Sequence, residues 1–316
     1  MPDNPFFVIN PNAANGRVGK NWPALKARTE EVLGPVDFEL TKAPGDASRI
    51  AREAAEVGHK LVVSCGGDGT HNEVVNGLIV DDKAVNPDTV MGLFPMGTGG
   101  DLRRTVGAFG NVEDHLSRLK DGSDWRVDIG RIDFVDFDGG PAHRYFINIG
   151  SCGLSGMVDL TVNHTTKFFG GRASFFIGTL RAMARYTYPS IEIRIDEGPA
   201  IAGPMTTIAV ANGQFFGGGM HFAPQAKMDD GLFDIIINHK SSFFQSVAGA
   251  RDVYAGKHLR RSAFEMHQGK TVEMTGENVY LDVDGEVPGK LPATFRIIAS
   301  ALALRVSDSP SRGMDE

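Results

Sequence analysis

The sequence predicts two domains of different class: an α/β domain over residues 1–125, and a β-rich domain, expected as a β-sandwich, over residues 126–306. The chain has 316 residues, which exceeds the roughly 100–200 residues of a usual domain. Up to residue 125, strand-like apolar runs alternate with segments of helical periodicity, which is typical of a parallel sheet with right-handed crossovers. After that residue, short segments of period two dominate, as in sheets that pack face to face.

The first domain is expected to begin with a strand at Phe6–Ile9. A helix over residues 20–33 follows, because its apolar side chains recur at helical spacing and Pro23 suits a first turn. Residues 36–40 alternate between apolar and polar side chains, as on a strand. These three segments predict the first strand-helix-strand unit of the sheet.

Further strands and helices complete the first domain. Asp46 is expected to cap a helix that stops at Gly58, and Asn111 is expected to cap the last helix. The remaining elements are apolar strands at 61–63 and 90–94 and helices through 74–78 and over 111–120. The carboxyl ends of parallel strands share one edge of a sheet. The loops that follow these strands therefore lie where open, Rossmann-like α/β sheets bind their ligands.

The second domain is expected to be mostly strands. Two helical stretches interrupt it, near 172–186 and 241–256. The polar tail at 307–316 is predicted to be disordered, and one alternative for the last segment before it is a return to the N-terminal domain. The predicted strands are 125–132, 144–149, 191–195, 205–211, 232–238, 279–283 and 294–298.

Composition and charge exclude several classes of protein. The formal net charge is -7, which argues against the broad basic face that nucleic-acid binding needs. The sequence has no apolar stretch of about 18 residues for a membrane span and no secretory signal, so a cytoplasmic protein is expected. Only two cysteines occur, Cys65 and Cys152, which excludes a disulfide framework.

Glycine-rich loops follow three of the predicted strands. The loop GGDGT at 66–70 places glycines where positive φ angles and close backbone approach to a ligand are allowed. Asp68 lies inside this loop, and a carboxylate among phosphate-binding amides is favourable when a divalent cation is present. The alternative is a tight strand-to-helix turn in which Asp68 only caps the helix.

Two other loops carry polar side chains toward the same edge. Residues 10–20 follow the first strand, and residues 95–105 follow the fourth, where they supply Thr98, Asp101 and the cations Arg103 and Arg104. Neither loop has the spacing of a P-loop or of a GxGxxG dinucleotide motif. The sequence therefore predicts a phosphate site that belongs to neither of these two types.

These three loops and four other segments resemble one known family. The soluble bacterial diacylglycerol kinases and their relatives, the sphingosine and ceramide kinases, share them in order and spacing, over about residues 5–306. One such segment is weak evidence, whereas seven in order are specific. They are NPNAANGR, TKAPGDA, GGDGTHNEVVNG and FPMGTGGD in the first half, and NIGSCGLSGMV, ANGQFFGGGMHFAPQAKMDDGLFDIII and LDVDGE in the second.

The resemblance implies a nucleotide site for ATP. The GGDGTHN segment would wrap the phosphates, and side chains from three other loops would complete the site. The implied nucleotide-binding residues are Asn10, Pro11, Asn12, Ala13, Ala14, Thr41, Gly66, Gly67, Asp68, Gly69, Thr70, His71, Asn72 and Thr98.

The resemblance also implies metal and catalytic roles for several residues. Asp68 and Asp101 would hold the catalytic Mg²⁺, directly or through water. Asp284 and Glu286 are the two candidates for the general base that accepts the proton of the acceptor hydroxyl. A structural Mg²⁺ would be held by Asp230 and by backbone oxygens of Lys227 and Leu232, and basic residues near the active site would be Lys167 and Arg172.

Simple turns are the alternative reading for both acidic segments of the second domain. The DVDGE segment also reads as an Asp-Gly hairpin, and Asp229 and Asp230 also read as solvated charges on a surface turn. The chain departs from the family at one position of the 95–105 loop, where Gly100 stands in place of the usual Asn. That departure removes one side-chain contact from the nucleotide site and leaves Asp101 in place.

The function implied by the resemblance is a lipid kinase. It would transfer the γ-phosphoryl group of ATP to a lipid hydroxyl, with diacylglycerol, converted to phosphatidate, as the first candidate. The alternatives are a kinase of a sphingoid base, ceramide or monoacylglycerol, an NAD kinase-like enzyme, and a non-catalytic regulator that binds lipid or nucleotide. The implied partners are ATP and a lipid at the membrane interface, reached by peripheral, transient contact, and no nucleic acid. A homodimer is one alternative for the oligomeric state.

Overall fold

The computed structural model describes residues 4–96, 100–157, 186–240, 249 and 251–307. The chain divides into two compact units. Unit 1 comprises Met1–Ile129 together with Ile298–Glu316, and unit 2 comprises Gly130–Ile297. Two long strands, β7 (Ser123–Val135) and β18 (Lys290–Val306), contribute residues to both units.

Unit 1 is built on a parallel sheet. In the described part of this unit the strand order is β18-β6-β3-β1-β2, and every neighbouring pair is parallel. The strand at its centre, β3, is buried along almost its whole length, as expected for a sheet covered on both faces. The strands are β1 (Phe6–Ile9), β2 (Asp37–Leu40), β3 (Leu61–Gly66), β6 (Val90–Pro95) and the Ala303–Arg305 segment of β18.

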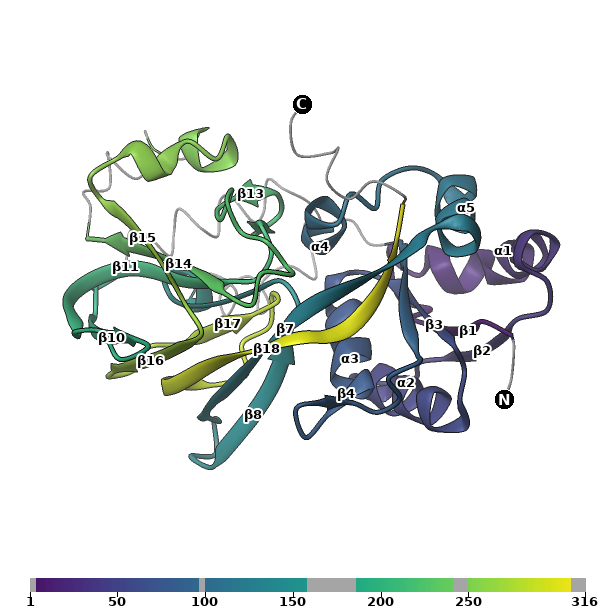
Figure 1. The fold of residues 1–316 in the computed structure, drawn as a ribbon, viewed down its shortest axis with the longest axis horizontal. Coiled ribbons are helices and arrows are strands. Elements are labelled where there is room, and N and C mark those ends of the chain that lie inside the picture. Colours follow the sequence, from purple (N-terminus) through teal and green to yellow (C-terminus); the bar gives the residue numbers. More distant parts are fainter. Residues whose placement is uncertain (1–3, 97–99, 158–185, 241–248, 250, 308–316) are drawn as a thin grey trace. The chain divides into compact units, whose positions relative to one another are not determined.

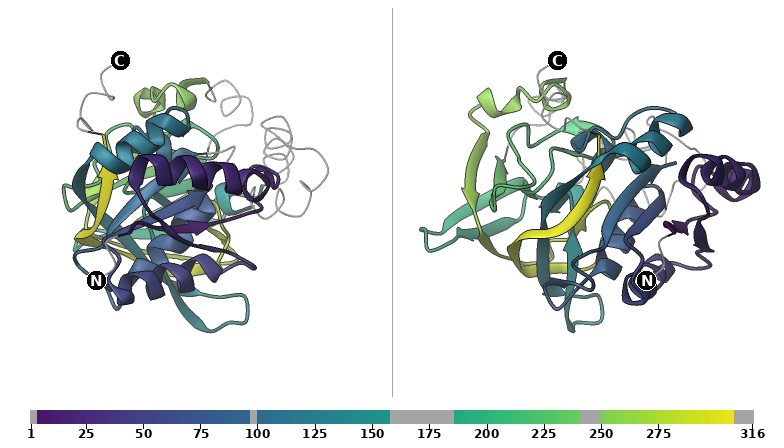
Figure 2. Two further views of the ribbon diagram at one scale, coloured as in Figure 1. Left: turned by 90° about the vertical axis from the view of Figure 1, so that its right-hand side faces the viewer. Right: turned by 45° about the vertical axis from the view of Figure 1, so that its right-hand side comes forward.

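Helices cover both faces of this sheet. Helices α1 and α5 lie on one face, and α2 and α3 lie on the other (Figures 1 and 2). The helices are α1 (Arg17–Leu33), α2 (Asp46–Val57), α3 (Asp68–Leu78), α4 (Asp101–Thr105) and α5 (Val112–Asp121), and a small hairpin is made by β4 (Ile79–Val80) and β5 (Lys83–Ala84). None of the described helices is long and apolar enough to cross a membrane.

Two local expectations for these helices are wrong. Helix α1 begins at Arg17, so Pro23 lies inside the helix, where it leaves the carbonyl of Gly19 without its usual helical donor. Asp46 does not cap α2, because the cap position is Gly45 and the Asp46 carboxylate instead accepts the backbone N–H groups of Lys42 and Ala43.

Unit 2 is a two-layered β structure with a large apolar core and a second, smaller apolar cluster that includes Phe222 and Ile236. One layer has the order β15-β14-β11-β9-β17, and the other runs β11-β10-β16-β18-β7-β8, so that β11 belongs to both. The register of β11 shifts between Met205 and Thr207, where this strand passes from one layer to the other. Buried side chains of both layers, among them Phe146, Phe233 and Phe295, form the core. The predicted combination of a parallel α/β domain with a β-sandwich is confirmed.

The strands of unit 2 follow the predicted segments with two differences. The predicted run at 144–149 is divided between β8 and β9, and β18 extends well beyond 294–298. The predicted helical stretch at 172–186 lies almost wholly outside the described residues, and of 241–256 the described residues 251–254 are helical. The elements are β8 (Pro141–Phe146), β9 (Ile149–Gly153), β10 (Ser190–Ile195), β11 (Ile201–Ala211), β12 (Phe215–Phe216), β13 (Met220–His221), β14 (Phe233–His239), β15 (Phe264–Gly269), β16 (Thr271–Gly276), β17 (Leu281–Val283) and a 3₁₀ helix at His258–Arg260.

Candidate functional site

Three loops of unit 1 meet at the carboxyl edge of its sheet. They follow strands β1, β3 and β6. The side-chain amide of Asn10 donates to Thr70 Oγ1 at 3.0 Å, which joins the first loop to the second. The backbone N–H of Gly100 donates to Asp68 Oδ2 at 2.7 Å, which joins the second loop to the third. Residues far apart in the sequence are thereby held in one polar cluster.

The GGDGT segment is a strand end followed at once by helix α3. The expected positive φ angles do not occur at Gly66, Gly67 or Gly69, and Gly67 is extended with φ −105°. Close packing explains the first glycine instead, since a Cβ on Gly66 would lie 2.5 Å from Thr70 Oγ1. The amides of the first turn of α3 have no acceptor within the helix, and such N–H groups favour anions.

The Asp68 carboxylate occupies the N-terminus of helix α4. Its Oδ2 accepts the N–H groups of Gly100 and Asp101 at 2.7 and 3.2 Å, and its Oδ1 accepts the N–H of Leu102 at 3.2 Å. Asp68 therefore fixes the loop after β6 against the loop after β3.

Asp101 lies beside Asp68 and carries the second carboxylate of the cluster. Its Oδ1 is 3.4 Å from NH1 of Arg104, which also donates to the carbonyl of Gly100 at 2.8 Å. In the part of the chain that the structure describes, no three acidic, histidine or cysteine side chains gather as a metal cluster. Oδ2 of Asp68 already accepts two N–H groups, whereas Oδ1 accepts one and keeps a second lone pair, so Asp68 and Asp101 fit a hydrated cation held through its water ligands.

The other implied nucleotide-binding residues of unit 1 fall into two groups. Pro11, Asn12, Ala13 and Ala14 form the turn between β1 and α1, and Thr41 follows β2 with its N–H bonded to the carbonyl of Ile9. These residues lie at the same edge of the sheet as Asn10. Thr98 lies outside the described residues.

His71 and Asn72 have buried side chains. Nδ1 of His71 lies 2.7 Å from Oγ of Ser64, inside the unit. Burial lowers the pKa of His71 to about 4, against a smaller opposing effect of Asp68, so the imidazole is neutral at physiological pH. The backbone N–H of His71 already donates to the carbonyl of Gly67 at 3.0 Å, so the backbone donors for a bound phosphate lie earlier in the first turn of α3.

In unit 2 the DVDGE segment is a tight hairpin. Asp284 and Gly285 both have positive φ angles, 50° and 86°, as a type I′ turn requires. Val283 and Glu286 exchange backbone hydrogen bonds of 2.8 and 3.1 Å across the turn. The hairpin that appeared as the simpler alternative is therefore present, and it carries the two candidate bases.

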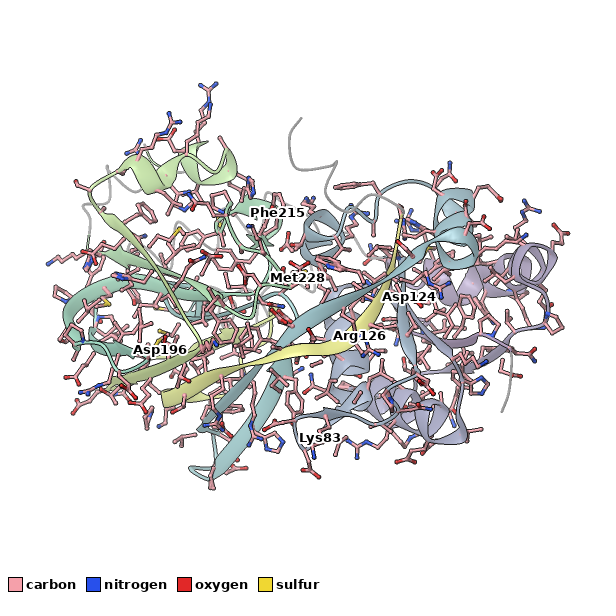
Figure 3. All side chains as sticks on the ribbon, in the orientation of Figure 1. Lys83, Asp124, Arg126, Asp196, Phe215 and Met228 are labelled. Atoms are coloured by element: carbon pink, nitrogen blue, oxygen red, sulfur yellow. The ribbon has the colours of Figure 1, made fainter. Side chains whose placement is uncertain are left out.

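The Asp284 carboxylate is bound by backbone amides. Oδ2 accepts the N–H of Ile147 at 3.0 Å, and Oδ1 accepts those of Asn148 and Ile149 at 3.1 and 2.9 Å. Asn148 also donates from its side chain to the carbonyl of Phe215, which is labelled in Figure 3. Asp284 therefore anchors the hairpin to the segment before β9.

Three residues that the sequence did not single out support the hairpin. Asp282 is buried and accepts the N–H of Gly285 at 3.0 Å and the hydroxyl of Ser151 at 3.2 Å. Arg144 forms an ion pair with Glu286 at 2.7 Å, and the Glu286 side chain is 42% exposed. The available signal was the DxDxE alternation itself, which puts Asp282, Asp284 and Glu286 two residues apart.

The third acidic segment of interest also lies in unit 2, between β13 and β14. Asp230 is exposed and its Oδ1 accepts the N–H of Leu232 at 3.1 Å. Nearby Asp234 is buried, and burial raises its pKa to about 6, with Asp230 raising it further and Lys227 opposing. Carboxylate and carbonyl oxygens in this segment fit a hard cation. Lys167 and Arg172 lie outside the described residues.

Solved structures share this fold. A candidate diacylglycerol kinase of Bacillus anthracis strain Sterne matches with a TM-score of 0.75 and 22% identity, covering 96% of this chain and 97% of that one. Yeast NADH kinase in complex with NADH matches with a TM-score of 0.53 and 11% identity, covering all of this chain and 87% of that one. At these identities the likeness concerns the fold alone.

Sequence comparison gives the family. Diacylglycerol kinases of Staphylococcus carnosus and Staphylococcus aureus are each 26% identical over 291 residues, covering 92% of this chain and 88–90% of theirs. The model of the diacylglycerol kinase catalytic domain matches residues 4–132, and the model of the YegS C-terminal NAD kinase β-sandwich-like domain matches residues 148–306. With both halves matched in order, the chain belongs to the bacterial diacylglycerol kinase family and is a lipid kinase phosphotransferase.

Proposed function

We propose that this kinase transfers the γ-phosphoryl group of ATP to the hydroxyl of diacylglycerol, giving phosphatidate and ADP. The observation that carries the proposal is the convergence of Asn10, the GGDGT loop and Asp101 at one edge of the unit 1 sheet. The names of the Staphylococcus relatives support the choice of diacylglycerol.

The donor nucleotide is assigned to unit 1. Amides in the first turn of α3, an 11-residue helix, supply N–H donors and the positive end of the helix dipole to the phosphates. Asn10 and Thr41 flank this position from neighbouring strands. Mg²⁺, when bound, offsets phosphate charge, and Asp68 and Asp101 are the residues that would hold it through water.

Glu286 is the favoured general base of the hairpin. Asp284 already accepts three amide N–H groups, which gives its carboxylate a structural task and leaves fewer of its lone pairs for a substrate proton. Glu286 is half-exposed and is oriented by Arg144. Its carboxylate would accept the proton of the lipid hydroxyl as the hydroxyl oxygen bonds to the γ-phosphorus and the bond to the ADP oxygen breaks.

The base assignment predicts different consequences for two substitutions. Glu286→Gln should lower kcat by a factor of about 10²–10⁴ because proton transfer is lost. It should change the thermal unfolding midpoint little, because the ion pair with Arg144 that is also lost is half-exposed and contributes about 0–1 kcal/mol. Asp284→Asn should lower the midpoint, because one carboxylate oxygen that accepts a backbone N–H is replaced by an NH₂ group, which is itself a donor. Kinase assays with diacylglycerol in mixed micelles, ATP and Mg²⁺, together with thermal unfolding, measure both. Glu277→Gln, an exposed acid of the same unit, is the control. Full activity of Glu286→Gln would overturn the assignment.

The acceptor is tested by a lipid panel in the same assay. Label in phosphatidate supports the proposal, and label in a phosphorylated sphingoid base, ceramide or monoacylglycerol would keep the mechanism and replace the substrate. NAD is included as an acceptor because the fold is shared with a NADH kinase. If the protein binds ATP but phosphorylates none of these acceptors, the result would favour a non-catalytic regulator over a diacylglycerol kinase.

We also propose that the kinase meets its acceptor at a membrane surface by transient, peripheral contact from the cytoplasm. The reason is chemical, since diacylglycerol resides in the bilayer while ATP is in water. Co-sedimentation with vesicles that contain diacylglycerol should be weak and should increase when ATP is replaced by a non-hydrolysable analogue. Sedimentation velocity of the free protein tests the homodimer.

A further inference from the structure

Gly100, where the chain departs from the family pattern, lies under the side chain of Arg103. Its backbone has φ +84°, a conformation that suits glycine and, among other residues, Asn. A Cβ placed on Gly100 would lie 2.4 Å from Nε, 2.6 Å from Cδ and 2.9 Å from Cγ of Arg103. No side chain at position 100 can coexist with this placement of Arg103, so the glycine and the arginine are coupled.

The loop after β6 has already used its backbone donors. The N–H groups of Gly100, Asp101 and Leu102 all bond to the Asp68 carboxylate. Arg104 is also engaged, because its guanidinium donates to the Gly100 carbonyl and pairs with Asp101. Among the side chains of residues 100–104, the guanidinium of Arg103 is a donor group that can serve a ligand.

The Arg103 guanidinium is itself incompletely satisfied. Its Nε is buried and has no hydrogen-bond partner among the residues that the structure describes. In the same residues Arg103 forms no ion pair within 4 Å. A buried N–H without an acceptor destabilises the folded chain, and an anionic oxygen that accepts from it would remove this penalty. Arginine suits phosphate oxygens in particular because its planar fork presents several N–H groups at once.

We propose that Arg103 is a phosphate-binding side chain for the donor nucleotide, in the place where the family usually has Asn, and that Gly100 is glycine to leave room for it. The inference rests on the proposed function in one respect, since it takes the loops at this edge as the donor site. It adds a residue that binds the donor by charge where the family has a neutral amide.

The test is a double-substitution cycle at positions 100 and 103, read by calorimetric titration of ATP, ADP and AMP into each protein. Arg103→Met keeps an unbranched apolar stem over Gly100 and removes the guanidinium, and it should weaken ATP binding by a factor of about 10–100. The KM for lipid should not change. AMP affinity should change little if Arg103 contacts the β- or γ-phosphate.

A stricter test is whether substitutions at positions 100 and 103 have non-additive effects on ATP affinity. Gly100→Asn alone should weaken ATP binding because the new side chain displaces Arg103. Adding Asn to an Arg103→Ala protein, which has no Cγ or Cδ over position 100, should restore ATP affinity relative to Arg103→Ala alone, because the family's contact is then available without the clash. Thermal unfolding of each variant separates this effect from misfolding, and Arg52→Ala, an exposed arginine of helix α2, is the charge control.

ATP binding and lipid phosphorylation together distinguish an error about Arg103 from an error about the kinase activity. If Arg103→Met binds ATP as the unsubstituted protein does while lipid phosphorylation continues, the role of Arg103 is overturned and the kinase stands. Additive effects at the two positions would also overturn it. If the unsubstituted protein binds no ATP and phosphorylates no lipid, both fall together.

Discussion

Gly66 leaves the space into which Thr70 packs at the end of strand β3. A methyl group there would meet the Thr70 side chain at 2.5–2.9 Å, and Thr70 in turn accepts the hydrogen bond from Asn10. The glycine is thus required by a contact between the strand and the following helix, and its backbone torsion would suit any residue. The polar cluster of unit 1 depends on this small volume.

Substitution of Gly66 by alanine should therefore destabilise the protein by about 1–3 kcal/mol, because the added methyl overpacks the turn. We also expect weaker ATP binding, since Thr70 and Asn10 must shift. Gly140→Ala is the matched control, because a Cβ at that position meets ordinary contacts of 3.4 Å and longer. Chemical denaturation measures the difference, and equal midpoints for the two variants would contradict this account.

The hydrogen-bond partners of the acidic site residues could not be predicted from the sequence. The position of Asp284 and Glu286 on a turn followed from the motif, whereas Asp68 and Asp101, expected inside loops, are the first residues of helices α3 and α4. The partners of these four carboxylates did not follow from the motifs. Asp284 bonds to amides about 136 residues earlier in the chain, and no spacing rule connects such positions. Hydrogen bonds between distant segments depend on the tertiary fold, which local patterns do not specify.

Helix α5 begins with a complete capping box. The Asn111 side chain accepts the N–H groups of Glu113 and Asp114 at 2.8 and 3.3 Å, and the Asp114 carboxylate accepts the N–H of Asn111 at 2.7 Å. The sequence predicted Asn111 as this cap, and the structure confirms it. This success reflects the local nature of the interaction, which needs only residues within one helical turn.

Replacing Asn111 by alanine should cost about 1 kcal/mol, because two first-turn amides lose their acceptor. Asn111→Asp should retain most of the stability, since its carboxylate can accept the same bonds and is favoured by the helix dipole. Urea denaturation of the three proteins gives the comparison. An equal loss of stability in Asn111→Ala and Asn111→Asp would mean that the Asn111 side chain does not stabilise the protein by capping.

Helix α4 is short, and Asp68 holds its N-terminus from another loop. Asp68→Asn should abolish kinase activity and lower the free energy of unfolding by about 1–3 kcal/mol, because an amide group can accept on only one of its two atoms. A purely catalytic role would leave stability unchanged. Parallel activity and denaturation measurements separate the two, with Asp88→Asn, an exposed acid of the same unit, as the control.

The ends of helices and strands were predictable where the apolar periodicity stopped at a glycine. Helix α2 ends at Gly58 as expected, because that residue adopts φ 100°. The start of α1 was misplaced because Gly16 and Arg17 carry no helical signal and Pro23 suggested a later first turn. Strand β2 was identified by alternation, yet its Phe38 is 40% exposed, since β2 is the edge strand of the unit 1 sheet.

Acidification should lower the folding stability of unit 1 and maintain or raise that of unit 2. In unit 1, burial is the main cause that lowers the pKa of His71 and of His115 from 6.5 to about 4. Their neutral forms stabilise the fold fully above pH 6.5, and this contribution is lost as pH falls toward 4, at up to about 1.4 kcal/mol per pH unit for each histidine. In unit 2, the raised pKa of Asp234 gives a contribution that is present below pH 3.8 and lost as pH rises through 6.

Hydrogen exchange between pH 7 and 5, without added Mg²⁺, tests this difference. Amides of β3 and β6 should lose protection on acidification, whereas those of β11 and β14 should keep or gain it. The double variant His71→Gln, His115→Gln should remove most of the pH dependence in unit 1. Parallel loss of protection in both units, in the parent and in this variant, would contradict the assignment.

At the scale of the whole chain, the change from α/β to β-rich structure was predictable because the hydrophobic period changes near residue 125. The contribution of the last strand to unit 1 was left as an alternative, since the strand was predicted only over residues 294–298. The structure pairs Ala303–Arg305 with β6 in parallel. A strand's partner depends on which edge of a sheet remains open, and a strand's own sequence does not state this.

The position of β18 beside β6 also has a consequence for biosynthesis. Arg305 pairs with Asp124 on β7, labelled in Figure 3, and donates to the carbonyl of Leu119 at 2.8 Å. A ribosome that adds about 5–20 residues per second makes β18 roughly 10–40 seconds after β6. For that interval the nascent chain presents β6 as an open, apolar sheet edge, and such edges are templates for aggregation. The first half of this enzyme is therefore the part that a chaperone must protect during translation.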